Sequence, residues 1–261
     1  LRHIRTDGLA LVNTDLEATG DAMCHDGALA QGLRQKAVSL MTFGLGESAT
    51  LRVTATKSSL SGVSFSINGG RAWWLEICGR HHAGNAVAAI TVAQRMGLTD
   101  EQIAEALASF RPADKRLEVT RIAGTTVIND AYNANPDSMR AAIDAMDDLP
   151  DLGRRVLILG DMRELGAQTD RCHRQIGEKA GRSTAQVIIS VGAHARIVAD
   201  GVTMTAGTTK RIYLYPSVET LMEKLPRMLE SGDIVLLKAS RGVRLERVIP
   251  VIEKSVHRVM S

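Results

Sequence analysis

The second half of the chain alternates short apolar runs with helix-patterned segments, and this rhythm constrains the fold more than any other feature. The apolar runs lie at 156–159, 186–191, 211–215 and 234–237. Helix-patterned segments lie at 136–146, 171–180, after Gly192 and at 218–229. Such alternation favours a parallel sheet with helices on its faces. We therefore predict an α/β domain here.

The first part of the chain carries mainly strand patterns. Runs at 9–12 and 51–56 and the alternation of Val63, Phe65 and Ile67 with polar residues predict strands. The turn sequence Asn-Gly-Gly at 68–70 predicts a hairpin that returns through 73–78. The remaining expected elements are helix and loop at 14–36, helices at 83–90 and 99–110, and strands at 117–122 and 126–129. We place the domain boundary near 131–136.

Composition narrows the class of protein. The 32 basic and 29 acidic residues leave a formal charge of +3, which argues against nucleic acid as a partner. No apolar run reaches the length of a membrane span, so we expect no membrane insertion. Cys24, Cys78 and Cys172 are sparse and form no metal-ligand cluster, which favours a reducing, cytoplasmic compartment.

Two predicted strands end in polar loops, where open α/β sheets bind ligands. The run 156–159 leads into Asp161 and Glu164, and the run 234–237 leads into Lys238, Ser240 and Arg241. Carboxylates on one loop and cations with a hydroxyl on the other suit a substrate that carries carboxylates and an amine. A solvated surface pair of Lys238 and Arg241 is an equally good interpretation.

Two other places offer polar side chains. His81 and Asn85 lie one helical turn apart, and the amide suits an adenine edge, although local capping at the start of a helix is the favoured interpretation of these two residues alone. The segment 129–138 is rich in Asn and Asp, which build turns but also bind ligands between domains. Asp130 is suited to ribose hydroxyls and Arg116 to phosphate or ribose. Neither a phosphate-binding G-x-x-x-x-G-K-[ST] loop nor G-x-G-x-x-G occurs.

Four stretches, in order, resemble the Mur ligase family. They are GRHHAGN at 79–85, DAYNANPDSM at 130–139, LGDMRELG at 159–166 and KASRG at 238–242. The second is the most specific and resembles the members that add D-alanyl-D-alanine. The resemblance implies that residues 1–133 are the C-terminal part of a P-loop-type central ATP-binding domain. It implies that residues 134–261 are the Rossmann-like C-terminal domain, which binds the acceptor.

The family's UDP-sugar domain, P-loop, magnesium-binding glutamate and carbamylated lysine would lie upstream of residue 1. We therefore assign no catalytic residue and no metal ligand to this chain, and we expect the fragment alone to be inactive. The resemblance gives ATP contacts to His81, Asn85, Arg116, Asp130 and Tyr132. It gives substrate contacts to Asn133, Asn135, Asp161, Glu164, Lys238, Ser240 and Arg241. His82 and Ala239 depart from the family's usual Asn and Gly.

The activity implied by the resemblance is ATP- and Mg²⁺-dependent joining of D-alanyl-D-alanine to UDP-N-acetylmuramoyl-tripeptide through an acyl phosphate, by a cytoplasmic monomer. The third stem-peptide residue, lysine or diaminopimelate, stays open. One alternative is another amino-acid-adding Mur ligase or a folylpolyglutamate synthase relative. A second alternative, from a different class, is a non-catalytic module that binds a nucleotide or peptide.

Overall fold

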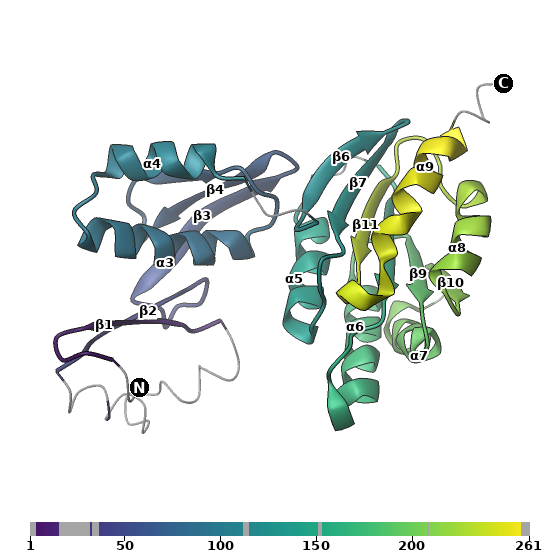
Figure 1. The fold of residues 1–261 in the computed structure, drawn as a ribbon, viewed down its shortest axis with the longest axis horizontal. Coiled ribbons are helices and arrows are strands. Elements are labelled where there is room, and N and C mark those ends of the chain that lie inside the picture. The colour runs from purple at the N-terminus through teal and green to yellow at the C-terminus, as the bar shows by residue number, and fades with distance from the viewer. Residues whose placement is uncertain are drawn as a thin grey trace. The chain divides into compact units, whose positions relative to one another are not determined.

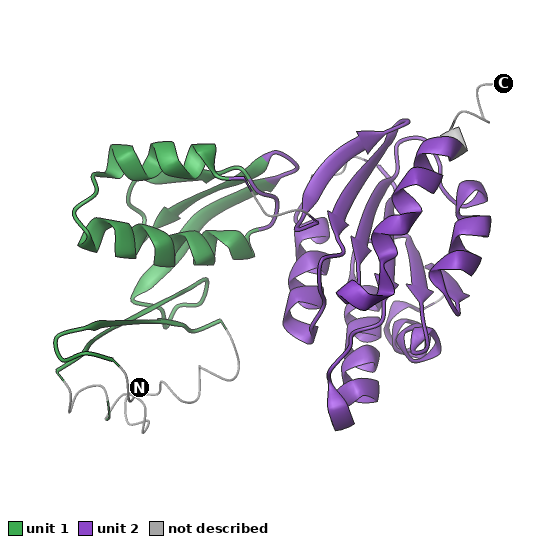
Figure 2. Ribbon diagram, in the orientation of Figure 1, with its two compact units in different colours: residues 1–58, 62–76, 80–110 green, residues 59–61, 77–79, 111–261 purple. Residues whose placement is uncertain are grey.

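The structure, a computed structural model, describes residues 4–15, 32, 37–111, 115–150, 153–207 and 209–256. Contacts divide the chain into two compact units. The first comprises residues 1–58, 62–76 and 80–110, and the second comprises 59–61, 77–79 and 111–261 (Figure 2). The helix and loop predicted at 14–36 lie almost entirely outside the described residues. Among the helices described, none is long and apolar enough to span a bilayer.

The first unit contains a five-stranded sheet in sequential order. Its strands are β1 (Leu9–Asn13), β2 (Ser39–Gly44), β3 (Leu51–Ser59), β4 (Gly62–Ile67) and β5 (Ala72–Leu75). The pairs β1–β2 and β2–β3 are parallel, and β4–β5 is the predicted antiparallel hairpin. Asn68 and Gly69 both have positive φ, at 51° and 74°, which the tight turn between β4 and β5 requires.

Two helices, α3 (His81–Arg95) and α4 (Asp100–Ser109), follow the hairpin. The predicted apolar stripe of α3 is confirmed, since Ala83, Ala86, Val87 and Ile90 are all buried. Helix α4 begins at a capping box, in which the Thr99 side chain accepts from the Gln102 backbone and the Gln102 side chain accepts from the Thr99 backbone. These residues fix where the helix starts.

The second unit contains a six-stranded sheet in the order β10-β9-β8-β11-β7-β6. Its strands are β6 (Glu118–Ile122), β7 (Thr125–Asp130), β8 (Arg155–Gly160), β9 (Val187–Val191), β10 (Arg211–Tyr215) and β11 (Ile234–Lys238). Only the β6–β7 pair is antiparallel within this sheet as described. The predicted α/β class with a Rossmann-like domain is confirmed.

The domain boundary expected at residues 133/134 differs from the observed division. Strand β7 pairs along its length with β11, so β6 and β7 are part of the second sheet. The second compact unit accordingly takes in everything from residue 111 onward. The strand pattern of 117–129 was recognised, but its sheet partner lies more than one hundred positions away in the sequence.

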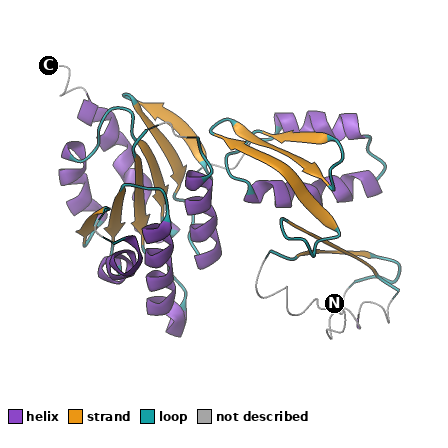
Figure 3. Ribbon diagram, turned by 180° about the vertical axis from the view of Figure 1, so that it is seen from behind, coloured by secondary structure: helices purple, strands orange, loops and turns teal. Residues whose placement is uncertain are grey.

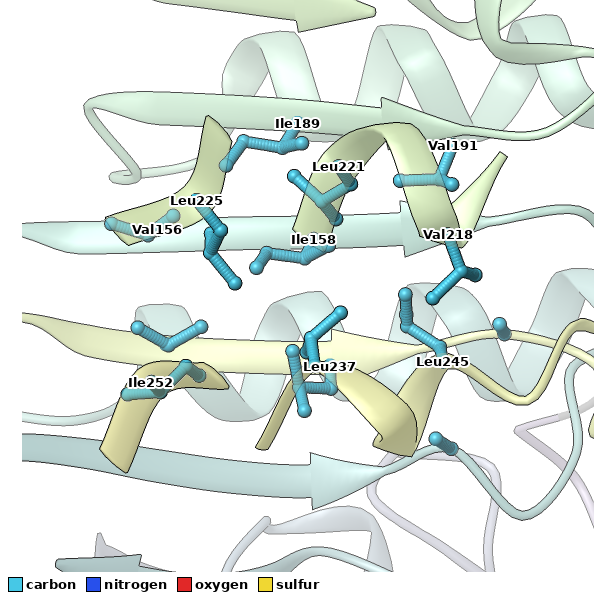
Figure 4. Close-up of a cluster of buried hydrophobic side chains, with 14 of the residues drawn as sticks. Val156, Ile158, Ile189, Val191, Val218, Leu221, Leu225, Leu237, Leu245 and Ile252 are labelled. Carbon is cyan, nitrogen blue, oxygen red and sulfur yellow. The ribbon is translucent and has the colours of Figure 1, made fainter. Parts of the chain in front are cut away.

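Helices cover both faces of this sheet (Figures 1 and 3). One face carries α5 (Pro136–Asp147), α6 (Thr169–Arg182) and α7 (Ala195–Ala206), and the other carries α8 (Val218–Lys224) and α9 (Ile249–Val256). Alternate strand residues such as Val156 and Ile158 pack with Val218 and Leu221 of α8 (Figure 4). The strands that lead to these loops are therefore anchored in a packed core.

Candidate functional site

The carboxyl ends of the parallel strands meet at one edge of the second sheet. In the strand register Lys238, the last residue of β11, stands opposite Asp130 at the end of β7 and opposite Leu159 of β8. The loops after all three strands therefore start side by side. This arrangement brings together the polar loops that the sequence analysis singled out.

Lys238 points into the protein rather than into solvent. Its Nζ lies 2.7 Å from Asp130 Oδ2 and donates to the Asn133 carbonyl oxygen at 2.9 Å. The residue is only 3% exposed, so it is not a solvated surface cation. Burial raises the pKa of the Asp130 carboxyl, and the attraction of Lys238 acts in the opposite direction. The pair fixes the start of the segment 130–135.

Ser240 joins three loops. Its Oγ donates to the Ala134 carbonyl oxygen at 3.3 Å and accepts from the Arg163 backbone at 2.9 Å. Its own backbone N–H donates to the Asp161 carbonyl oxygen at 3.0 Å. Because the side chain is buried and its hydroxyl proton is used internally, Ser240 positions the edge of the site.

The Tyr132 ring contacts two arginines. The guanidinium carbon of Arg116 lies 4.7 Å from the ring centroid, and that of Arg241 lies 5.5 Å from it. Both distances are within the range of a cation–π contact. All three residues are exposed, so they present positive charge to solvent at this edge of the sheet.

Asp161 is held by the loop that leads into α7. Its Oδ2 accepts from the Ala193 backbone at 2.9 Å, and its Oδ1 accepts from the His194 backbone at 3.0 Å. Gly192 has φ +120°, and a Cβ there would lie 2.4 Å from Asp161 Oδ2. The carboxylate therefore links the loop after β8 to the loop after β9, and Gly192 makes room for it.

His173 was missed by the sequence analysis, because nothing distinguishes a histidine in a helix from its neighbours. It is 1% exposed, and its Nε2 accepts from the Met162 backbone at 3.0 Å. Its Nδ1 lies 2.7 Å from the Thr169 carbonyl oxygen, so these two contacts place the proton on Nδ1. Burial lowers the pKa of His173, which favours this neutral form.

The remaining predicted substrate residues are exposed around the same edge. Asn133 accepts from the Ala134 backbone at 2.9 Å, and Asn135 caps α5 by accepting from the Ser138 backbone at 2.8 Å. Glu164 has the positive φ of 64°, which turns the loop after β8. All three residues are exposed, so a ligand can reach them.

His81 and Asn85 belong to the first unit, whereas the other predicted site residues all belong to the second unit. They sit in the first turns of α3, with Asn85 exposed and His81 half-buried. The His81 ring lies 4.1 Å from the His82 ring. Helical spacing places His81 and Asn85 on the face of α3 opposite its buried apolar residues.

A pocket of about 470 Å³ opens at the carboxyl ends of β8 to β11. Its lining includes Asp161, Arg163, Ser217, Glu219, Arg244 and Arg247. Strand β8 continues into α6 on one face of the sheet, whereas β11 leads to α9 on the other face (Figure 1). Ligands of open α/β sheets bind where connections diverge in this way.

We compared the chain with protein families and with curated proteins. Residues 115–241 match the Mur ligase, glutamate ligase domain. The chain is 31% identical over 80% of its length to UDP-N-acetylmuramoyl-tripeptide–D-alanyl-D-alanine ligase of Bacillus subtilis, and 32% identical over 69% of its length to that of Escherichia coli. It covers 46% and 39% of these two relatives, so it spans about half the length of the curated relatives it matches.

Solved structures share the fold. MurF from Acinetobacter baumannii aligns over 97% of this chain and 53% of its own, with a TM-score of 0.79 and 24% identity. MurF ligase from Thermotoga maritima, solved in complex with ADP, aligns over 97% of this chain and 55% of its own, with a TM-score of 0.73 and 22% identity. Domain, relatives and fold agree with the resemblance read from the four sequence stretches: the chain belongs to the Mur ligase family.

Proposed function

We propose that this chain supplies the C-terminal half of an ATP-dependent ligase that joins D-alanyl-D-alanine to UDP-N-acetylmuramoyl-tripeptide. The observation that carries the proposal is the segment 130–135, which Lys238 and Ser240 pin to the carboxyl edge of the sheet. That segment carries exposed tyrosine and asparagine side chains in a Mur ligase domain. The curated relatives are ligases named for this reaction.

The reaction needs activation because a carboxylate carbon is a poor electrophile. Transfer of the ATP γ-phosphoryl group breaks the γ-P–O bond to ADP and forms a new P–O bond to the carboxylate. The dipeptide amine then attacks the acyl carbon, the C–O bond to phosphate breaks, and the ammonium proton is lost. Positioning dominates such transfers and is worth up to about 7–11 kcal/mol in favourable intramolecular cases.

We assign ATP contacts to His81, Asn85, Arg116 and Tyr132. Asp130 has a different part in this proposal from the ribose contact first expected. Its carboxylate is bonded to Lys238 and to the Leu117 backbone, which adjoins Arg116. Asp130 therefore positions Arg116 and the start of the segment 130–135. In this proposal Asp130 does not bind the nucleotide itself but positions the residues that bind it.

We assign acceptor contacts to Asn133, Asn135 and Glu164, whose side chains are exposed. Asp161, Lys238 and Ser240 hold the loops that carry those contacts, because their polar atoms are bonded inside the protein. The exposed groups match a zwitterionic dipeptide, with amides for its peptide group and a carboxylate for its ammonium. The proposed enzyme is a cytoplasmic monomer.

Mg²⁺ would neutralise charge on the triphosphate when bound. Over the described part of the chain, one group of three candidate ligands comes together, Asp161, His173 and His194. Mg²⁺ prefers oxygen ligands, and the His173 Nε2 lone pair already accepts from the Met162 backbone. These residues do not fit Mg²⁺, so no step of the mechanism is assigned to a metal held by this chain.

The test is a chimera in which this chain replaces the matching segment of the Bacillus subtilis ligase. We expect ADP release that depends on both UDP-N-acetylmuramoyl-tripeptide and D-alanyl-D-alanine. Activity with a single amino acid in place of the dipeptide would instead support another Mur ligase or a folylpolyglutamate synthase relative. A folded chimera that binds nucleotide but forms no amide with any acceptor would support the non-catalytic module.

A further inference from the structure

The ring of Tyr132 brings together two residues that the sequence resemblance assigned to different ligands. Arg116 was expected on the ATP side and Arg241 on the acceptor side. Their guanidinium carbons nevertheless lie 4.7 Å and 5.5 Å from the same ring centroid. Their separation is therefore at most about 10 Å, close to the Debye length in 0.1 M salt, so each feels the charge of the other.

Among Lys238, Arg116, Arg241 and Asp130 the charges do not balance. Lys238, Arg116 and Arg241 are cationic, whereas Asp130 supplies one carboxylate, and that carboxylate is paired with Lys238 at 2.7 Å. Within the residues that the structure describes, neither Arg116 nor Arg241 forms an ion pair with a carboxylate. Asp130 attracts Arg116 but is already paired with Lys238, so two exposed guanidinium groups on one ring still attract an anion.

The backbone under both arginines is fixed. Arg241 directly follows Ser240, which is bonded to Ala134 and to the Asp161 backbone. The Tyr132 backbone N–H donates to the Lys115 carbonyl oxygen at 3.2 Å, next to Arg116. Stacking on the tyrosine ring further limits where each guanidinium can point, so less side-chain entropy is lost on binding.

We propose that Arg116 and Arg241 form a two-guanidinium clamp for a phosphate group, with the Tyr132 ring as the surface that both contact. Arg241 thus acts on phosphate and not on the dipeptide. Guanidinium forks match phosphate oxygens in pairs, which makes phosphate the anion of choice. This inference rests on the proposed function: the clamp holds the group in transit, first as the γ-phosphoryl group, then in the acyl phosphate and finally as free phosphate.

The experiment measures binding to the chain itself by calorimetry, with inorganic phosphate, ADP, ATP and D-alanyl-D-alanine as separate probes. We expect Arg241→Ala to weaken ATP and inorganic phosphate about tenfold or more, the size of one charge-assisted hydrogen bond. Dipeptide binding stays unchanged. Arg241→Lys keeps the charge but loses the fork and the stacking, so it recovers part of the affinity. ADP, which lacks the γ-phosphoryl group, is affected less than ATP.

The matched control is Arg196→Ala, because the Arg196 side chain is 82% exposed on α7 and is paired with Asp200. It leaves all four affinities unchanged. The double variant Arg116→Ala with Arg241→Ala loses less than the two single losses combined, because both residues hold one group.

The clamp is overturned if Arg241→Ala leaves phosphate and ATP affinity intact, or if it abolishes dipeptide binding alone. It is also overturned if the wild-type chain binds no phosphate compound at all. Failure of the proposed function has a different signature. In that case Arg241 still controls phosphate binding, but the chimera forms no amide bond with D-alanyl-D-alanine.

Discussion

Lys238 and Asp130 face each other across neighbouring parallel strands, with Nζ and Oδ2 2.7 Å apart and side chains 4% and 13% exposed. The strand register alone places them together, and Lys238 then reaches the carbonyl oxygen of Asn133. One buried cation thus fixes a carboxylate and the turn that follows it. This contact fixes the geometry of the segment 130–135 together with the hydrogen bond from Ser240 to Ala134.

Lys238→Met tests that dependence. It leaves the Asp130 carboxylate buried without its ion-pair partner, which typically costs about 3–5 kcal/mol. We expect the free energy of unfolding in urea to fall by that amount. As a control, Arg196→Ala removes an exposed pair with Asp200 and changes stability by at most about 0.5 kcal/mol. Equal losses of stability in the two variants would show that the buried pair of Lys238 and Asp130 contributes no more than an exposed pair.

We expect the stability of the chain to fall at acidic pH because of His173. Burial lowers the pKa of His173 below 6.5, so the unfolded chain takes up a proton before the folded chain does. Stability from this residue is complete above pH 6.5 and is lost as pH falls through the folded pKa. Neighbouring His194 adds to the lowering, whereas Asp161 and Asp170 oppose it.

The measurement compares urea unfolding of the wild type and His173→Gln between pH 8 and pH 5. Glutamine keeps an acceptor for the Met162 backbone but does not titrate. We expect the wild type to lose stability faster than the variant below pH 6.5. Parallel pH profiles would contradict the neutral state of the buried ring.

Local patterns in the sequence predicted most strands and helices of the second unit, because buried parallel strands are short continuous apolar runs. They also predicted that Asp161, Lys238 and Arg241 follow strand ends. Local patterns could not predict whether a side chain at a strand end points into the protein or into solvent. Lys238 turns inward because its Nζ binds two carbonyl oxygens and a carboxylate of β7 and the loop that follows it. These partners lie over one hundred positions away from Lys238 in the sequence. The same distance hid the pairing of β7 with β11.

Gly192→Ala tests the link between Asp161 and α7. A Cβ at this position would lie 2.4 Å from the carboxylate, and the φ of +120° disfavours alanine. We expect a loss of about 1–3 kcal/mol from the backbone conformation, increased by displacement of Asp161. The control is Gly232→Ala, where φ is +91° and nothing lies within 4 Å. The contact argument fails if both variants unfold at the same urea concentration.

Cys78 is predicted to be chemically silent in the folded protein. It is 1% exposed, and burial, with Asp148 and Asp130, raises the pKa of its thiol to about 12. Since the thiolate is the reactive form, iodoacetamide at pH 8 leaves Cys78 unmodified until the chain unfolds. Cys172 is partly exposed and reacts earlier. Peptide mass spectrometry after brief alkylation distinguishes the two, and early labelling of Cys78 would refute its burial.

Asn135 combines a structural and a proposed binding role, and substitution separates them. Its Oδ1 caps α5 through the Ser138 backbone, so Asn135→Ala should cost about 1 kcal/mol of unfolding free energy. Asn135→Ser keeps the capping oxygen and stays within about 0.5 kcal/mol of the wild type. Serine lacks the amide donor, however, so in the chimera we expect a raised KM for D-alanyl-D-alanine with kcat little changed. An unaltered KM would show that Asn135 caps the helix but does not bind the dipeptide.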